Sequence, residues 1–182
     1  MPTEGREQDI MDIRYITPQE VLDALNAAVE ERGADFVYPI NWRTNFNPAL
    51  GETIPPAGHG QCQNYLIISD DQPAQPACIA GYVYHKLGFL NEVVQRNLNK
   101  ASVSYLFWPG TAGGGDKRKF GDVVLDDISI EVLLGVQEDQ DNGDSWGVAR
   151  DRRVAPLIAH IAHQAELQAE FEADFGGENV AD

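Results

Sequence analysis

Apolar residues recur at helical spacing along much of the chain. The clearest segment begins at Thr17, Pro18 and Glu20, which match an N-cap, a first-turn proline and the glutamate of a capping box. Apolar positions three and four residues apart follow, and Gly33 is placed to end this helix in a left-handed conformation. Further helical patterns are predicted at about residues 76–88, 91–99, 126–141 and 146–171, the last interrupted by Pro156.

Short runs of aromatic and β-branched residues predict a small sheet. These runs lie at residues 35–38, 62–68 and 102–108. With the helices they indicate a mostly helical α+β fold in a single domain over residues 14–175, because a chain of 182 residues is long enough for one buried core. Residues 1–13 and 176–182 lack periodicity, so we expect a flexible arm and a flexible acidic tail there.

Charge narrows the class of partner. The formal net charge of -16 disfavours binding to nucleic acid and to anionic membranes, because both need clustered lysines and arginines. It suits solubility and steering toward a basic protein. No apolar stretch has the length of a signal peptide or a membrane span, and the chain has two cysteines, so we expect no disulfide framework and a cytoplasmic location.

Two histidines and two cysteines form the sharpest candidate for chemistry. His59, Cys62, Cys78 and His85 are a sufficient ligand set for tetrahedral zinc, which is the one candidate cofactor. Cys78 and His85 would share a helix face but lie about 10 Å apart along its axis, which is long for two ligands of one ion. The alternative is that the cysteines are buried apolar residues or a thiol pair.

Two further hypotheses involve the same residue types. Cys78 near a helix N-terminus, with His59 or His85 as base, is a candidate nucleophile, although no catalytic signature surrounds it. His160 and His163 are one turn apart but lack a carboxylate to complete a metal set, which favours surface histidines.

A glycine-rich loop over residues 110–119 carries Lys117, Arg118 and Lys119. It departs from the P-loop pattern because Arg118 stands where the magnesium-binding hydroxyl belongs. The alternatives are an exposed insertion, an anion site built with glycine amides, or a basic spot that docks on an acidic partner. This loop and the loop at residues 39–61 are where we expect binding surfaces, because long irregular segments often carry function.

Paired carboxylates in the sequence are predicted to start helices and to solvate the surface. The pairs are Asp126 with Asp127 and Asp139 with Asp141. Asp144 is predicted as the N-cap of the helix that begins near Trp146.

Two segments together resemble a known group of proteins. The first comprises Val29-Glu30-Glu31-Arg32-Gly33, Phe36-Val37-Tyr38 and Cys78-Ile79-Ala80-Gly81 with His85 and Gly88; the second is Gln137-Glu138-Asp139-Gln140-Asp141-Asn142-Gly143-Asp144-Ser145-Trp146-Gly147. They resemble small uncharacterised proteins of actinobacteria and their bacteriophages. The resemblance implies a phage accessory protein, and it brings no assigned activity or catalytic residue.

Three classes of function follow. The acidity, the lack of a catalytic motif and the resemblance favour a phage-type accessory protein that binds a host or phage protein without catalysis. The alternative is a structural protein of a virion or its assembly, which would self-associate into a homo-oligomer. The third is a zinc-dependent or cysteine-based enzyme.

Overall fold

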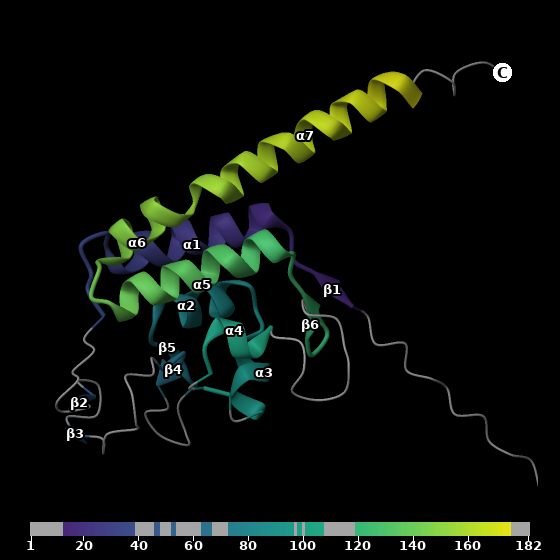
Figure 1. Ribbon diagram of the computed structural model, residues 1–182. Coiled ribbons are helices and arrows are strands. Elements are labelled where there is room, and N and C mark those ends of the chain that lie inside the picture. The colour runs from purple at the N-terminus through teal and green to yellow at the C-terminus, as the bar shows by residue number, and fades with distance from the viewer. Residues whose placement is uncertain are drawn as a thin grey trace, which may run out of the picture.

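Two helices of fifteen residues, α1 (Pro18–Arg32) and α5 (Asp127–Asp141), form the frame of the fold in this computed structural model (Figure 1). Helix α2 (Ile79–Lys86) packs against both, and α6 (Trp146–Arg153) packs against α5 and α1. The structure describes residues 13–38, 46–47, 52–53, 63–66, 73–96, 98–99, 101–107 and 119–175. Of the predicted arm and tail, all but Ile13 lie outside these residues.

The remaining elements are short, apart from the last helix. The helices are α3 (Leu90–Gln95), α4 (Val103–Leu106) and α7 (Ala155–Phe175). The strands, each of two residues, are β1 (Arg14–Tyr15), β2 (Phe46–Asn47), β3 (Glu52–Thr53), β4 (Tyr65–Leu66), β5 (Gln75–Pro76), β6 (Lys119–Phe120) and β7 (Val123–Val124). The predicted fold class, mostly helical α+β, is therefore confirmed.

The strands form three small sheets. In the largest, β7 lies between β1, to which it is parallel, and β6, to which it is antiparallel. A turn through Gly121, which has a φ of 60°, joins β6 to β7. The pairs β2–β3 and β4–β5 are antiparallel.

The start and end of α1 confirm the prediction from sequence. Thr17 Oγ1 accepts a hydrogen bond from the Glu20 amide at 3.2 Å, and Glu20 Oε2 accepts one from the Thr17 amide at 2.8 Å, which completes a capping box. Gly33 follows the helix with a φ of 95°, and its amide donates to the Val29 carbonyl. Local sequence determines this helix, and its buried face contributes Val21, Leu25 and Val29 to the core.

The predicted sheet is wrong in its position. Residues 103–106 form helix α4 and not a strand, because the buried side chain of Gln137 on α5 accepts a hydrogen bond from the Val103 amide at 2.9 Å and so caps the helix. Val37 makes only an isolated bridge to Ser145. Of the three predicted strands, the run at 62–68 contains one, β4, within its described residues.

Other helix boundaries also differ from the prediction, and the helix expected at about 91–99 is α3, which ends at Gln95. Helix α2 begins at Ile79 and not near residue 76, because the Cys78 thiol and the Gln140 side chain of α5 accept hydrogen bonds from its first amides. Ser145 and not Asp144 is the N-cap of α6, since its Oγ accepts from the Val148 amide.

The centre of the core is aromatic. Trp146 is fully buried, and its ring meets those of Phe36 and Tyr82 edge-on at centroid distances of 4.9 and 5.2 Å. The Arg32 guanidinium lies over the rings of Phe36 and Tyr82 and donates to the Tyr82 hydroxyl. Three segments that are distant in sequence, around residues 32–36, 82 and 146, are thereby joined at one end of α1.

The predicted interruption near Pro156 is confirmed. Helix α6 ends at Arg153, Val154 follows as a bend, and α7 begins at Ala155, which places Pro156 in the first turn of α7. A proline is tolerated there because amides of the first turn have no partner within the helix. The break redirects the chain, and α7 extends diagonally beyond the rest of the molecule (Figure 1).

Candidate protein-binding surface

Cys78 acts as a helix cap in this structure. Its side chain is fully buried, the thiol donates to Asn64 Oδ1 at 3.5 Å, and the sulfur accepts from the Gly81 amide at 3.3 Å. Asn64 in turn donates to the carbonyls of Leu98 and Ala101. A side chain at position 81 would collide with the Asn64 carbonyl, so α2 packs closely on this segment. A nucleophile must reach its substrate, and this thiol has no exposed surface.

The predicted zinc ligands are only partly described. His59 and Cys62 lie outside the described residues, so the zinc site stays a prediction. Of the other two, Cys78 is buried beneath the start of α2, whereas His85 is exposed in its last turn. Within the described part of the chain, no three His, Cys, Asp or Glu side chains come together as a metal site would require.

The other predicted site residues are also at the surface or outside the described part. Lys117 and Arg118 lie outside it, and so does the side chain of Lys119, whose backbone belongs to β6. His160 is partly exposed and His163 is exposed, with its Nδ1 3.9 Å from Glu166 Oε2. The basic loop therefore stays a prediction, and the two histidines are surface residues as expected.

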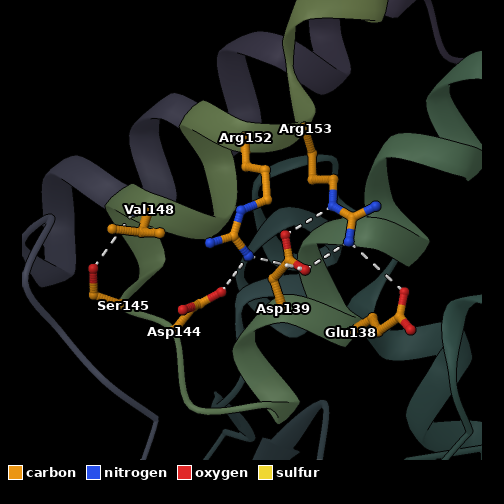
Figure 2. A network of polar contacts seen from close by, with 7 residues as sticks. All are labelled: Glu138, Asp139, Asp144, Ser145, Val148, Arg152 and Arg153. Carbon is orange, nitrogen blue, oxygen red and sulfur yellow. Dashed lines mark hydrogen bonds and ion pairs between the residues drawn. The ribbon is translucent and has the colours of Figure 1, made fainter.

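One predicted solvating carboxylate is instead a buried ion-pair partner (Figure 2). The Asp139 side chain is only 5% exposed, and its two oxygens accept hydrogen bonds from Arg153 Nε at 2.7 Å and Nη2 at 2.6 Å. Arg152 Nη1 lies 3.4 Å from Asp139 and also pairs with Asp144 at 2.5 Å. These arginines follow each other in α6, so the network fixes α6 on α5 and has a structural role.

Two carboxylates on the same stretch of α5 have pKa values that are shifted in opposite directions. Hydrogen bonds from Arg153 hold the pKa of Asp139 below its usual value, against the opposing effect of burial. Burial raises the pKa of Asp141 to about 6, and its hydrogen bond from Gln140 opposes the rise only in part. Among the described residues, no cation offsets the desolvation of Asp141.

Helix α7 differs from every other long helix because only its first part is packed. Leu157 is fully buried and Ile161 is half-buried against α1 and α5. Every residue from 162 to 174 is exposed. This distal segment, residues 162–175, is about 20 Å long at 1.5 Å per residue, and it is the part of α7 that extends past the body in Figure 1.

Apolar and acidic side chains form two adjacent rows on the distal segment. Leu167 and Phe171 are four residues apart, so they lie on one face, where their exposed fractions are 51% and 60%. Glu166, Glu170 and Asp174 are also spaced by four. Glu166 directly precedes Leu167, Glu170 directly precedes Phe171, and Asp174 continues the acidic row by one turn. We call this pair of rows the α7 face.

The acidic row interacts unfavourably with the dipole of α7. The C-terminal end of a helix carries a partial negative charge that favours cations. The last turn of α7 holds no basic residue, and no lysine or arginine follows Arg153 in the chain. An isolated helix of this length is marginal in water, so these acidic residues further weaken the segment in the free protein.

The sequence analysis missed the α7 face and placed binding surfaces in the loops at 39–61 and 110–119, of which the structure describes only residues 46–47, 52–53 and 119. The signal that was available is the lack of any lysine or arginine after Arg153, together with an apolar stripe that continues to Phe171. An apolar stripe on a helix is ordinarily taken as its buried side. Only the break before α7 shows that half of this stripe faces solvent.

Comparison with known proteins adds no relative. No family model, no curated protein and no solved structure matches the chain. The resemblance to actinobacterial and phage proteins therefore stays a prediction, and function has to be argued from the geometry. In the described residues, no helix combines the length and the hydropathy that a membrane span requires.

Proposed function

We propose that this protein is a binding module that docks on a partner protein through the α7 face. The observation that carries the proposal is the pair of exposed side chains, Leu167 and Phe171, on a helical segment that extends away from the body. An amphipathic helix that inserts apolar residues spaced by four into a partner surface is a recurrent mode of recognition.

Burial of the exposed parts of Leu167 and Phe171 favours such a contact. Full burial of a leucine or phenylalanine side chain contributes about 1.5–3 kcal/mol. A partner would also order the distal segment, and that ordering reduces the net gain. We therefore expect a reversible complex in which these two residues contribute most of the binding free energy.

A photo-crosslinking experiment in the source cells tests the location of the contact. A photoreactive amino acid replaces Gln164 in the full chain, one turn before Leu167, and a matched variant carries it at the exposed Gln95 of α3. We expect one partner protein to be crosslinked from position 164 and not from position 95. Crosslinks from position 95 alone would place the contact elsewhere and contradict the proposal.

Titration of the identified and purified partner then tests the two anchors. The double substitution Leu167→Ala and Phe171→Ala keeps helix-favouring residues, and we expect it to weaken binding at least 10-fold. The matched control is Tyr105→Ala with Val148→Ala, which removes similar exposed apolar surface from α4 and α6. Equal affinity of the anchor variant and the control would show that α7 is not the docking element.

A phage accessory role is the narrower form of this proposal, since the host or phage protein would be the partner. The virion-structural and enzymatic alternatives stay predictions.

A further inference from the structure

The acidic row of the α7 face constrains the chemistry of the partner. Its carboxylates run along one side of Leu167 and Phe171 over two turns, within reach of any surface that covers these two side chains. A partner that buries the apolar row without cations would desolvate part of the acidic row and leave it unpaired, which is unfavourable. Charge complementarity along this side is therefore required.

The last three arginines before α7 in the chain are engaged elsewhere. The nearest basic residues before α7 are Arg150, Arg152 and Arg153. They pair with Asp151, Asp144 and Asp139 respectively, all within α6 or on the α5 side of it. No lysine or arginine follows them, and in the described part of α7 the basic side chain beside the acidic row is His163, whose Nδ1 lies 3.9 Å from Glu166 Oε2.

Resting on the proposed function, we infer that the partner is a protein with an apolar surface flanked by lysine or arginine residues, which pair with Glu166, Glu170 and Asp174. The same cations would lie near the C-terminal end of α7 and offset the unfavourable interaction of its acidic residues with the helix dipole. Binding would thus stabilise the distal segment as well as cover it.

Other occupants fit the charges less well. In a second copy of this chain, the same acidic rows would face each other across the contact, and like charges repel. A membrane with anionic headgroups repels the row in the same way. Nucleic acid is excluded on the same ground.

A panel of three synthetic peptides tests the inference with the full-length protein. Each is a 20-residue amphipathic helix with the same leucine face, and the flanking positions are all lysine, all glutamine or all glutamate. We expect the lysine peptide to bind roughly 10-fold tighter than the glutamine peptide in fluorescence anisotropy, because each exposed ion pair changes affinity by about two- to fivefold. Raising the salt concentration should reduce that difference.

Matched variants distinguish the effect of the acidic row on peptide binding from the effect of the overall net charge of -16. The triple variant Glu166→Gln, Glu170→Gln and Asp174→Asn should bring the lysine and glutamine peptides to within about threefold of each other, since three exposed ion pairs are lost. The control Glu30→Gln, Asp35→Asn and Glu131→Gln neutralises three exposed carboxylates on the body and should leave the difference unchanged. If the control reduces the difference equally, binding depends on overall charge and the inference is wrong.

The outcomes distinguish the inference from the proposed function. If the glutamine peptide binds as tightly as the lysine peptide, and both depend on Leu167 and Phe171, docking through α7 stands and the basic partner is overturned. If no peptide depends on these two residues, the proposed function itself fails this test. Sedimentation of the protein alone tests for self-association. If the protein is a dimer and the double variant Leu167→Ala with Phe171→Ala is a monomer, a second copy occupies the α7 face and the inference of a basic partner is wrong.

Discussion

At the scale of single residues, Asp139 links α5 to α6 through hydrogen-bonded ion pairs. Replacing it by asparagine keeps the shape but removes the charge that Arg152 and Arg153 contact. Because Arg152 and Arg153 are partly exposed and screened, we expect Asp139→Asn to lower the free energy of unfolding by roughly 1–3 kcal/mol at pH 7. Urea denaturation followed by tryptophan fluorescence measures it.

The effect of Asp139→Asn should depend on pH. The folded pKa of Asp139 is depressed, so its stabilisation is present above the unfolded value near 3.8 and is lost as the pH falls through the folded pKa. The control is Glu138→Gln, because that side chain is 70% exposed and 3.8 Å from Arg153, and we expect a change within about 0.5 kcal/mol. A pH-independent loss in Asp139→Asn would indicate altered packing and contradict the ion-pair interpretation.

Asp141 provides a comparison of opposite sign on the same helix. Its folded pKa of about 6 lies above the usual value of 3.8 for an aspartate, so the ionised form disfavours folding as the pH rises between these values. We expect Asp141→Asn to raise the free energy of unfolding by roughly 1–3 kcal/mol above pH 6 and to have no such advantage below pH 3.8.

Sequence alone could not distinguish these two carboxylates. Both belong to the acidic end of one predicted helix, and the residues around them in the sequence predict a surface position for both. The arginines that bind Asp139 follow it by 13 and 14 positions, and only the turn at Gly143, with a φ of 96°, brings them back over α5. The role of a charged residue therefore depends on contacts that the local sequence does not contain.

At the scale of secondary-structure elements, the first amide of helix α4 is capped by a side chain of another helix. Gln137 on α5 is 5% exposed and caps the Val103 amide. Gln137→Met should leave that buried amide without its acceptor and destabilise the protein by roughly 1–3 kcal/mol. Amide hydrogen exchange at Val103 should become faster.

The matched control for this prediction is Gln95→Met, at an exposed position in α3. It removes the same amide group from the surface, and we expect a change within about 0.5 kcal/mol. Unchanged exchange at Val103 in Gln137→Met would contradict the capping role.

The elements that sequence predicts well are those whose signals are local. The capping box of α1 and the Asp126 cap of α5 are complete within four residues, and both helices begin where predicted. The segment at 102–108 fails because a short apolar run is compatible with a helix or a strand. Its outcome is decided by Gln137, more than thirty positions away. Strands of two residues, such as β1 and β7, are too short to show any period.

At the scale of the whole molecule, the fold class follows from the sequence, but the direction of α7 does not. The apolar stripe from Leu157 to Phe171 continues without interruption. The structure divides it near Ile161, because the break at Val154 directs the second half of α7 past the ends of α1 and α5 (Figure 1). The site that we propose arises from this geometry, which no local pattern encodes.

Removal of residues 165–182 tests whether the body folds without the distal segment. The packed side chains Leu157 and Ile161 remain, and six acidic residues are lost, which reduces self-repulsion. We expect the free energy of unfolding to change by less than about 0.5 kcal/mol, whereas Leu157→Ala should cost about 2–5 kcal/mol because it leaves a cavity in the core. A loss above about 1 kcal/mol on truncation would mean that the distal segment stabilises the body. Folding would then account for the exposed side chains of the distal segment, and the case for a docking helix would fail.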